Sequence, residues 1–154
     1  MKNTKQIRCV LVLFLVLIFS SSLFATEHDN LIPEILKPEI SALRSTNMFN
    51  DFSSFSEAKL AVIEDNLIRG IRSDNVGLQT SCAYFLGEMN SGKAMIPLLK
   101  LARHGATEES RIIAGLSLYK IHSKIGMRQL KGMARDDESE LVRKVFDRIY
   151  KKYT

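Results

Sequence analysis

Similar residues recur at a fixed interval of 32 positions in the C-terminal half of this 154-residue chain. Residues 86–103 match residues 118–135 without a gap. The matching pairs are Leu86 and Leu118, Met89 and Ile121, Ser91 and Ser123, Met95 and Met127, Leu98 and Leu130, Leu101 and Met133, Ala102 and Ala134, and Arg103 and Arg135. Such a period is typical of helical repeat proteins, because one helix pair cannot bury its apolar face alone and stacking supplies the missing neighbour.

Amphipathic helices are predicted throughout residues 56–152. The first segment shows the pattern, since Leu60, Ile63, Leu67, Ile68 and Ile71 fall on one helical face. We expect six helices: Ser56 to about Arg72, a second ending near Met89, Met95 to Arg103, Thr107 to about Ile121, a shorter one around Ile125 to Met133, and a last one capped by Asp136–Glu138 and reaching past Ile149. The turns are short, so consecutive helices are expected to run antiparallel.

The repeat resembles the HEAT-like repeats of the phycobilisome-lyase type, whose pattern is roughly Val-Arg-x-x-Ala-Ala-x-x-Leu-Gly-x-Ile, a turn, and Ala-x-Pro-x-Leu. The matching stretches are Cys82–Met89 with Ala94–Leu99, then Ser110–Leu118, and then Leu141–Phe146. The likeness covers residues 57 to 152. It implies an all-α fold, a right-handed α-α superhelix (a HEAT-like solenoid) of about three helix pairs.

Three departures from that pattern stand out. Gln79 replaces the expected arginine in the first copy, and Phe146 and Asp147 replace the small pair in the third. Pro97 occurs once, in the opening turns of its helix, where a missing N–H costs least. Atypical end repeats are expected in a solenoid, because each has one face without a neighbour.

The N-terminus has the order of a secretory signal peptide. Basic residues precede an unbroken apolar run over 10–19, and small residues follow up to Ala25. We expect cleavage after Ala25, or after Ser22, and an uncleaved membrane anchor is the alternative. The predicted organisation is a signal peptide (1–25), an N-terminal segment with one or two short helices (26–56), which includes a helix from Pro38 and a loop over 47–54, and a repeat domain (57–154).

Removal of the signal peptide changes the charge of the chain. Lys2, Lys5 and Arg8 leave without an acidic residue, so the formal net charge falls from +5 to +2. A net charge of +2 does not indicate nucleic-acid binding, which needs a strongly basic stripe. The mature chain keeps a single cysteine, Cys82, at a repeat position that it shares with Ala114, and we expect it to be a small buried side chain.

No residues of the mature chain have the spacing of a catalytic or metal-binding site. His28, His104 and His122 lack a second ligand at metal spacing. The sequence has no glycine-rich phosphate loop and no nucleophile-elbow motif. Acidic pairs such as Glu108-Glu109 lie at helix starts, where they complement the helix dipole. We therefore expect no enzyme, no metal and no cofactor.

One predicted helix is apolar on more than its core side. In the helix from Thr107, the residues Ile112, Leu116 and Tyr119 lie opposite the core stripe of Ala114 and Leu118. We predict a concave partner-binding surface with an apolar floor (Tyr84, Ile112, Leu116 and Tyr119) and a basic flank (Lys144, Arg148 and Lys151). Two alternatives remain: the helix around Ile40 and Leu43 folds back over this floor, or the register differs.

These observations favour a monomeric, non-catalytic adaptor, periplasmic or secreted, that binds a protein partner through the concave surface. We expect no nucleic acid as partner, and no membrane contact after signal cleavage. Two other functions stay open. One is an accessory subunit of an enzyme that handles a chromophore or cofactor, as the likeness to lyase repeats implies. The other is a structural component of the envelope without a discrete ligand.

Overall fold

The structure is a computed structural model that describes residues 30–45 and 55–154. The predicted signal peptide and cleavage sites, the predicted loop over 47–54 and His28 lie outside these residues. The chain divides into two units between Ile32 and Pro33. In the first unit, Asn30–Ile32 form a turn. All elements below belong to the second unit, Pro33–Thr154.

The described residues form helices and contain no strand, which confirms the predicted all-α class. The 3-10 turn η1 (Glu34–Leu36) leads into α2 (Lys37–Ser45), and then follow α3 (Glu57–Gly70), α4 (Val76–Glu88), the 3-10 turn η4 (Gly92–Ala94), α5 (Met95–His104), α6 (Glu108–Lys120), α7 (Lys124–Asp136) and α8 (Glu140–Tyr153). The six helices predicted for residues 56–152 are present. Pro38 is the second residue of α2, so this helix begins one residue before the proline.

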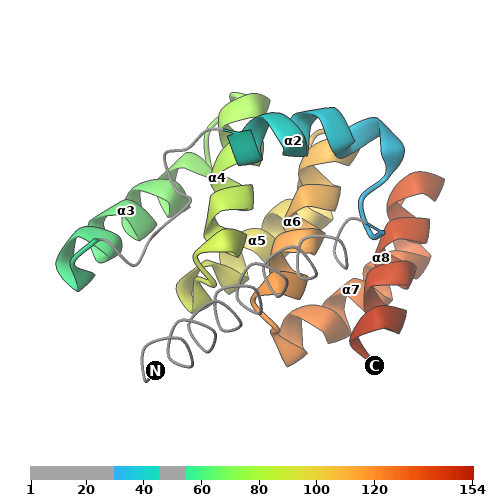
Figure 1. Ribbon diagram of the computed structural model, residues 1–154. Helices are drawn as coiled ribbons and strands as arrows, with labels where there is room; N and C mark the ends of the chain where they lie inside the picture. The colour runs from blue at the N-terminus through green and yellow to red at the C-terminus, as the bar shows by residue number, and fades with distance from the viewer. Residues whose placement is uncertain (1–29, 46–54) are drawn as a thin grey trace, which may run out of the picture. The chain divides into compact units, whose positions relative to one another are not determined.

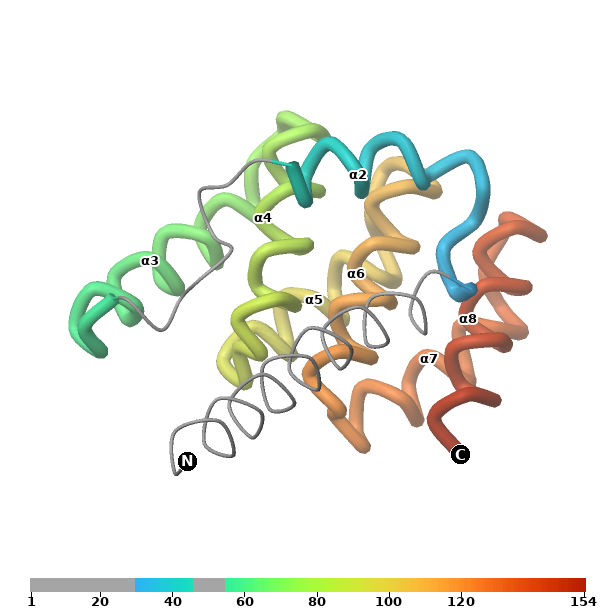
Figure 2. Tube along the Cα trace, in the orientation of Figure 1, coloured from blue at the N-terminus to red at the C-terminus, as the bar shows by residue number. Residues whose placement is uncertain are grey.

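The helices pack in a regular order within this unit. Helix α4 packs against α6, and α6 against α8, whereas α5 packs against both α6 and α7 (Figure 1). Helix α3 packs against α4 at one end of the row (Figure 2). The core between the helices is made of fully buried side chains: Leu86, Leu98, Ile113, Leu118, Met127, Leu130, Val142, Phe146 and Ile149.

Helix N-caps recur at the 32-residue interval seen in the sequence. Asn75, Thr107 and Ser139 begin α4, α6 and α8, and each side chain accepts a hydrogen bond from the N–H three residues on, at 3.0, 3.2 and 3.3 Å. The same interval separates Asn90 and His122, which follow α4 and α6 with φ of 53° and 51°. Left-handed residues there end a helix by turning the chain sharply. The 32-residue interval therefore recurs in the helix ends as well as in the residue types.

The turns before α4, α6 and α8 are held by one recurring contact. Gln79, Arg111 and Arg143 each donate a hydrogen bond to the carbonyl six residues earlier, at 3.4, 2.9 and 2.5 Å. Gln79 Nε2 also donates to the Ile71 carbonyl at 2.9 Å. The glutamine that departs from the repeat pattern thus does the same work as the two arginines. It satisfies carbonyls that a helix end leaves without a partner.

The acidic turn Asp136–Glu138 has a different role from the predicted one. We expected it to cap the last helix, but Ser139 is the N-cap of α8. Asp137 Oδ1 instead accepts the Ser139 N–H at 2.9 Å, and the carboxylate pairs with Arg111, Nε to Oδ2 at 3.1 Å. Both side chains are only 6% exposed. This buried ion pair fastens the α7–α8 turn to α6.

A glycine explains the large residue in the third copy of the repeat. Phe146 of α8 stands where the other copies have Ala114 and Cys82, and it is completely buried. A Cβ atom on Gly115 of α6 would lie 2.5 Å from Phe146 Cε1, closer than carbon atoms approach. The aromatic ring therefore occupies the space that Gly115 leaves empty.

Helix α3 is the least covered helix of the row. It has no buried residue, although Leu60, Ile63 and Leu67 are partly covered. Glu64 joins it to the turn after α4, because its carboxylate accepts a 2.5 Å hydrogen bond from Ser91 Oγ and pairs with Lys93 at 2.9 Å. The Ser91 hydrogen bond, followed by Lys93, holds the pKa of Glu64 below its usual range. The contacts of Glu64 thus attach α3 to the rest of the row in addition to its partly covered apolar side chains.

Candidate functional site

The predicted apolar floor is mostly buried in this structure. Ile112 is 0% exposed, Tyr119 7% and Tyr84 8%, while Leu116 is half-buried. Helix α6 was predicted to need cover on two sides, and nine of its thirteen residues are buried. The described residues therefore present no open apolar groove over α4 and α6.

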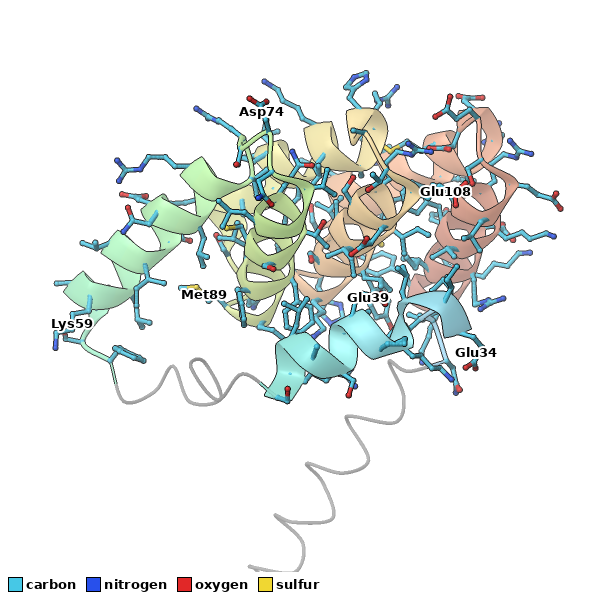
Figure 3. All side chains as sticks on the ribbon, turned by 90° about the horizontal axis from the view of Figure 1, so that it is seen from above. Glu34, Glu39, Lys59, Asp74, Met89 and Glu108 are labelled. Carbon is cyan, nitrogen blue, oxygen red and sulfur yellow. The ribbon has the colours of Figure 1, made fainter. Side chains whose placement is uncertain are left out.

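Helix α2 provides a contact to this face. Figure 1 shows α2 running across α4 and α6, and Figure 3 shows it along the same helices from another side. Ile40 on α2 is 2% exposed, and Arg44 near its end hydrogen-bonds the side chain of Tyr84. This arrangement is the one in which the helix around Ile40 folds back over the floor, an alternative that the sequence left open.

A polar cluster surrounds Tyr84 at the edge of the floor. Lys120 of α6 pairs with Glu88 of α4, and its Nζ lies 5.2 Å from the centroid of the Tyr84 ring. Burial raises the pKa of Tyr84 well above its usual range, and the carboxylate of Glu88, which accepts a hydrogen bond from the hydroxyl, raises it further. The hydroxyl stays protonated at neutral pH, so this cluster joins helices and offers no nucleophile.

The predicted basic flank on α8 is largely neutralised. Lys144 pairs with Glu140 at 2.6 Å and Lys151 pairs with Asp147 at 2.7 Å, each with an acid one turn earlier. Arg148 also makes an interaction. The sequence carried the signal for these pairs, because Glu or Asp four residues before Lys favours an ion pair on a helix surface. The flank is exposed but presents little net charge.

A stronger cationic surface, which the sequence reasoning missed, lies on α7. Its residues Lys124, Arg128, Lys131 and Arg135, the α7 stripe, recur at i, i+4, i+7 and i+11 and are all exposed. None of them forms an ion pair with a residue that the structure describes. The periodicity could be read from the sequence, but the stripe becomes a surface only because the opposite face of α7 packs into the core.

A hollow of about 290 Å³ between α7 and α8 adjoins the α7 stripe. Its walls include Lys131, Arg135, Lys151 and Tyr150, with Asp147 as the acidic member. The Nζ of Lys131 lies 4.7 Å from the centroid of the Tyr150 ring and donates a 3.3 Å hydrogen bond to its hydroxyl. The hollow could receive the end of an acidic side chain.

The remaining candidates for chemistry are structural. Cys82 is 5% exposed, as predicted, and burial raises the pKa of its thiol. His104 is the last residue of α5, and the His122 ring lies 5.9 Å from that of Tyr119 and 6.3 Å from that of Tyr153. Within residues 30–45 and 55–154, no three His, Cys, Asp or Glu side chains are grouped to hold a metal ion.

Comparisons with known proteins add no relative. No family model, no curated protein sequence and no solved structure matches the chain. Among the helices that the structure describes, none combines the length and apolar character that a membrane crossing requires.

Proposed function

We propose that this chain is an exported, non-catalytic binding module, a HEAT-like solenoid that captures an acidic segment of a protein partner along α7. Export rests on the signal-peptide pattern of residues 1–25. Support for the solenoid comes from the recurrence of N-caps and turn contacts at 32 residues and from the order in which the helices pack. The α7 stripe carries the binding proposal.

The stripe suits a helical or extended acidic segment. Its four cations span about 16 Å along the helix axis, at 1.5 Å per residue. Because they have no ion pair with described residues, an acidic partner does not have to break one. Exposed charges of one sign raise the association rate of an oppositely charged partner and select against others.

An apolar side chain beside the stripe favours a protein over a phosphate backbone as partner. Ile125 is 57% exposed on α7, next to Lys124 and one turn from Arg128. A peptide side chain can cover an isoleucine, whereas phosphate contacts are purely electrostatic and polar. The first repeat has Gly92, Ile96, Leu99 and Arg103 at the corresponding positions, so it does not carry the stripe of the second repeat.

The predicted apolar floor is not the contact surface in this proposal. Ile112 and Tyr119 would have to lose the cover that they have in the structure before a partner could touch them. The basic flank contributes less than predicted, because Glu140 and Asp147 already pair with its lysines.

The test uses a fluorescein-labelled helical peptide with glutamates at i, i+4, i+7 and i+11, and fluorescence anisotropy as the readout. We expect Arg128→Gln with Arg135→Gln to raise the Kd about fivefold, since an exposed ion pair contributes roughly 0.2–1 kcal/mol. Neither arginine forms a side-chain hydrogen bond or an ion pair with a described residue, so the circular dichroism of the variant should not change.

The matched control is Lys59→Gln with Lys144→Gln, which removes the same charge from α3 and α8, away from the hollow beside the stripe. This control should change the Kd less than twofold. An equal loss of affinity for the peptide in both variants would show that only net charge matters. Tighter binding of a DNA duplex than of the peptide would show that the partner is not a protein. Either result overturns the proposal.

A further inference from the structure

The first repeat lacks an ion pair that the second repeat buries. In the second repeat, the guanidinium of Arg111 spans the Gly105 carbonyl and the Asp137 carboxylate, with Nη2 to Oδ1 at 3.2 Å, and it also reaches Glu138 at 3.4 Å. The residues 32 positions earlier than Arg111, Asp137 and Glu138 are Gln79, Gly105 and Ala106. A shorter amide and two residues without charged side chains thus replace the ion pair.

The structure shows why no acid stands at Gly105. A Cβ atom there would lie 2.5 Å from Ser110 Oγ and 2.7 Å from the Leu101 carbonyl oxygen. Ser110 forms a capping box with Thr107 and accepts the Thr107 N–H, which is the role of Asp137 toward Ser139 in the next repeat. The hydroxyl of Ser110 thus accepts the hydrogen bond that the carboxylate of Asp137 accepts in the next repeat.

A cavity of about 430 Å³ lies at this place, and Gln79, Gly105 and Ala106 all line it. Its inner surface is apolar, since Ile71 and Leu101 are 4% and 5% exposed and line it from the turn after α3 and from α5. Cavities of this size accept small organic ligands, and an apolar floor with a few polar groups is typical of them.

Two cations and one acid stand at the rim. Arg72 and Lys100 line the cavity and are exposed, with Asp74 as the acidic member. Asp74 lies at the turn before α4, where Figure 3 labels it. Neither Arg72 nor Lys100 has an ion pair with a described residue. The rim therefore favours an anion over the floor of Ile71 and Leu101.

We propose that this cavity binds a carboxylate that carries a short apolar chain. The carboxylate lies between Arg72 and Lys100, and the chain covers Ile71 and Leu101. Such a group is found on a small organic acid and on the C-terminal residue of a peptide. The site lies on the turn between α3 and α4, on α4 and on α5, away from the α7 stripe. It therefore goes beyond the proposed function and fails or succeeds separately from it.

The test is a titration of the purified protein with hexanoate, followed by NMR at the backbone amides of Gly105 and Ala106. We expect saturable shifts with hexanoate, and at least fivefold weaker binding of hexanamide, which has no charge. Arg72→Gln with Lys100→Gln should reduce the affinity for hexanoate to that for hexanamide. An acetylated peptide ending in leucine, with a free or an amidated C-terminus, tells the two sources apart. Tighter binding of hexanoate indicates a small organic acid, and tighter binding of the peptide with a free C-terminus indicates a peptide end. In both cases the compound with the free carboxylate must bind more tightly than the matching amide.

The control variants test the place of the site. Ile96 lies at the rim and is 52% exposed, so Ile96→Trp should block the binding of hexanoate. Ile125 on α7 is 57% exposed, and Ile125→Trp should leave this binding unchanged. Equal binding of hexanoate and hexanamide, unchanged binding in the Ile96→Trp variant, or no shift at 50-fold excess of hexanoate over protein would each overturn the proposal.

Discussion

Gly115 and Phe146 show at the residue scale how the repeat tolerates a large side chain. Phe146 stands at a position where the other copies have Ala114 and Cys82, and Gly115 on the neighbouring helix has no Cβ that would meet its ring. Interiors are packed to near-crystal density, so a gain of volume on one helix requires a loss on its neighbour. The size of Phe146 is therefore explained only together with the missing side chain of Gly115.

Replacement of Gly115 by alanine should therefore destabilise the protein. The added Cβ would come within 2.5 Å of a completely buried ring. Overpacking of this kind costs about 1–3 kcal/mol. Urea denaturation followed by circular dichroism measures the change in the free energy of unfolding.

Gly132 is the matched control for this substitution. It lies inside α7, and a Cβ atom there would meet no neighbour within 4 Å. Gly132→Ala should raise the free energy of unfolding by about 0.5–1 kcal/mol, because alanine is the better helix former. If both alanines stabilised the protein, the packing of Phe146 against Gly115 would be incorrect.

At the scale of elements, α2 decides whether the apolar floor is a surface. Ile40 is its most deeply buried residue, and Arg44 ties its end to Tyr84. A helix of nine residues is not stable by itself in water, so α2 needs this contact as much as the floor needs cover.

Ile40→Asp should release α2 and expose the floor. An unpaired carboxylate does not remain in an apolar environment, so the helix detaches while α4, α6 and α8 stay folded. We expect increased fluorescence of the dye ANS and loss of helical dichroism equal to about one short helix. Ser41→Asp, at the exposed neighbouring position, should do neither. Equal ANS fluorescence in the wild type and the Ile40→Asp variant would mean that α2 does not cover the floor.

At the scale of the whole molecule, stability is uneven along the row of helices. Helix α6 contacts neighbours on several sides, whereas α3 contacts α4 and depends on Glu64 for its further attachment. Terminal elements of a repeat array open first, because each has a single neighbour. Acid should therefore release α3 before the rest of the row.

The direction of this pH effect follows from the lowered pKa of Glu64. A group whose pKa is lower in the folded state stabilises it above the unfolded pKa, here 4.5, and this contribution is lost as the pH falls through the folded value. Hydrogen exchange of the α3 amides should thus accelerate below about pH 4.5 relative to the α6 amides. Glu64→Gln should make exchange in α3 fast already at neutral pH, whereas Asp65→Asn should not. Acceleration of α3 and α6 together would contradict this order.

The sequence alone was sufficient for the six helices and for the cap at Thr107, because these depend on residues within a few positions of one another. It assigned the cap of α8 to the wrong residues. The periodicity of Leu60 to Ile71 predicted α3, and the capping role of Thr107 is a matter of three residues. The paired state of Lys144 and Lys151 was also readable from acids one turn away. The exposed face of α7 follows the same local rule, although its significance required knowledge of what the other face packs against.

Only the tertiary structure decided which apolar and charged residues remain available. The contact that Tyr84 makes with Arg44 joins residues forty positions apart. The loss of an ion pair at Gln79 becomes visible only when the turn at Gly105, which lines the same cavity, is placed beside it. Contacts between residues so far apart depend on the way each helix is oriented on its neighbours, and a local pattern carries no information on that orientation.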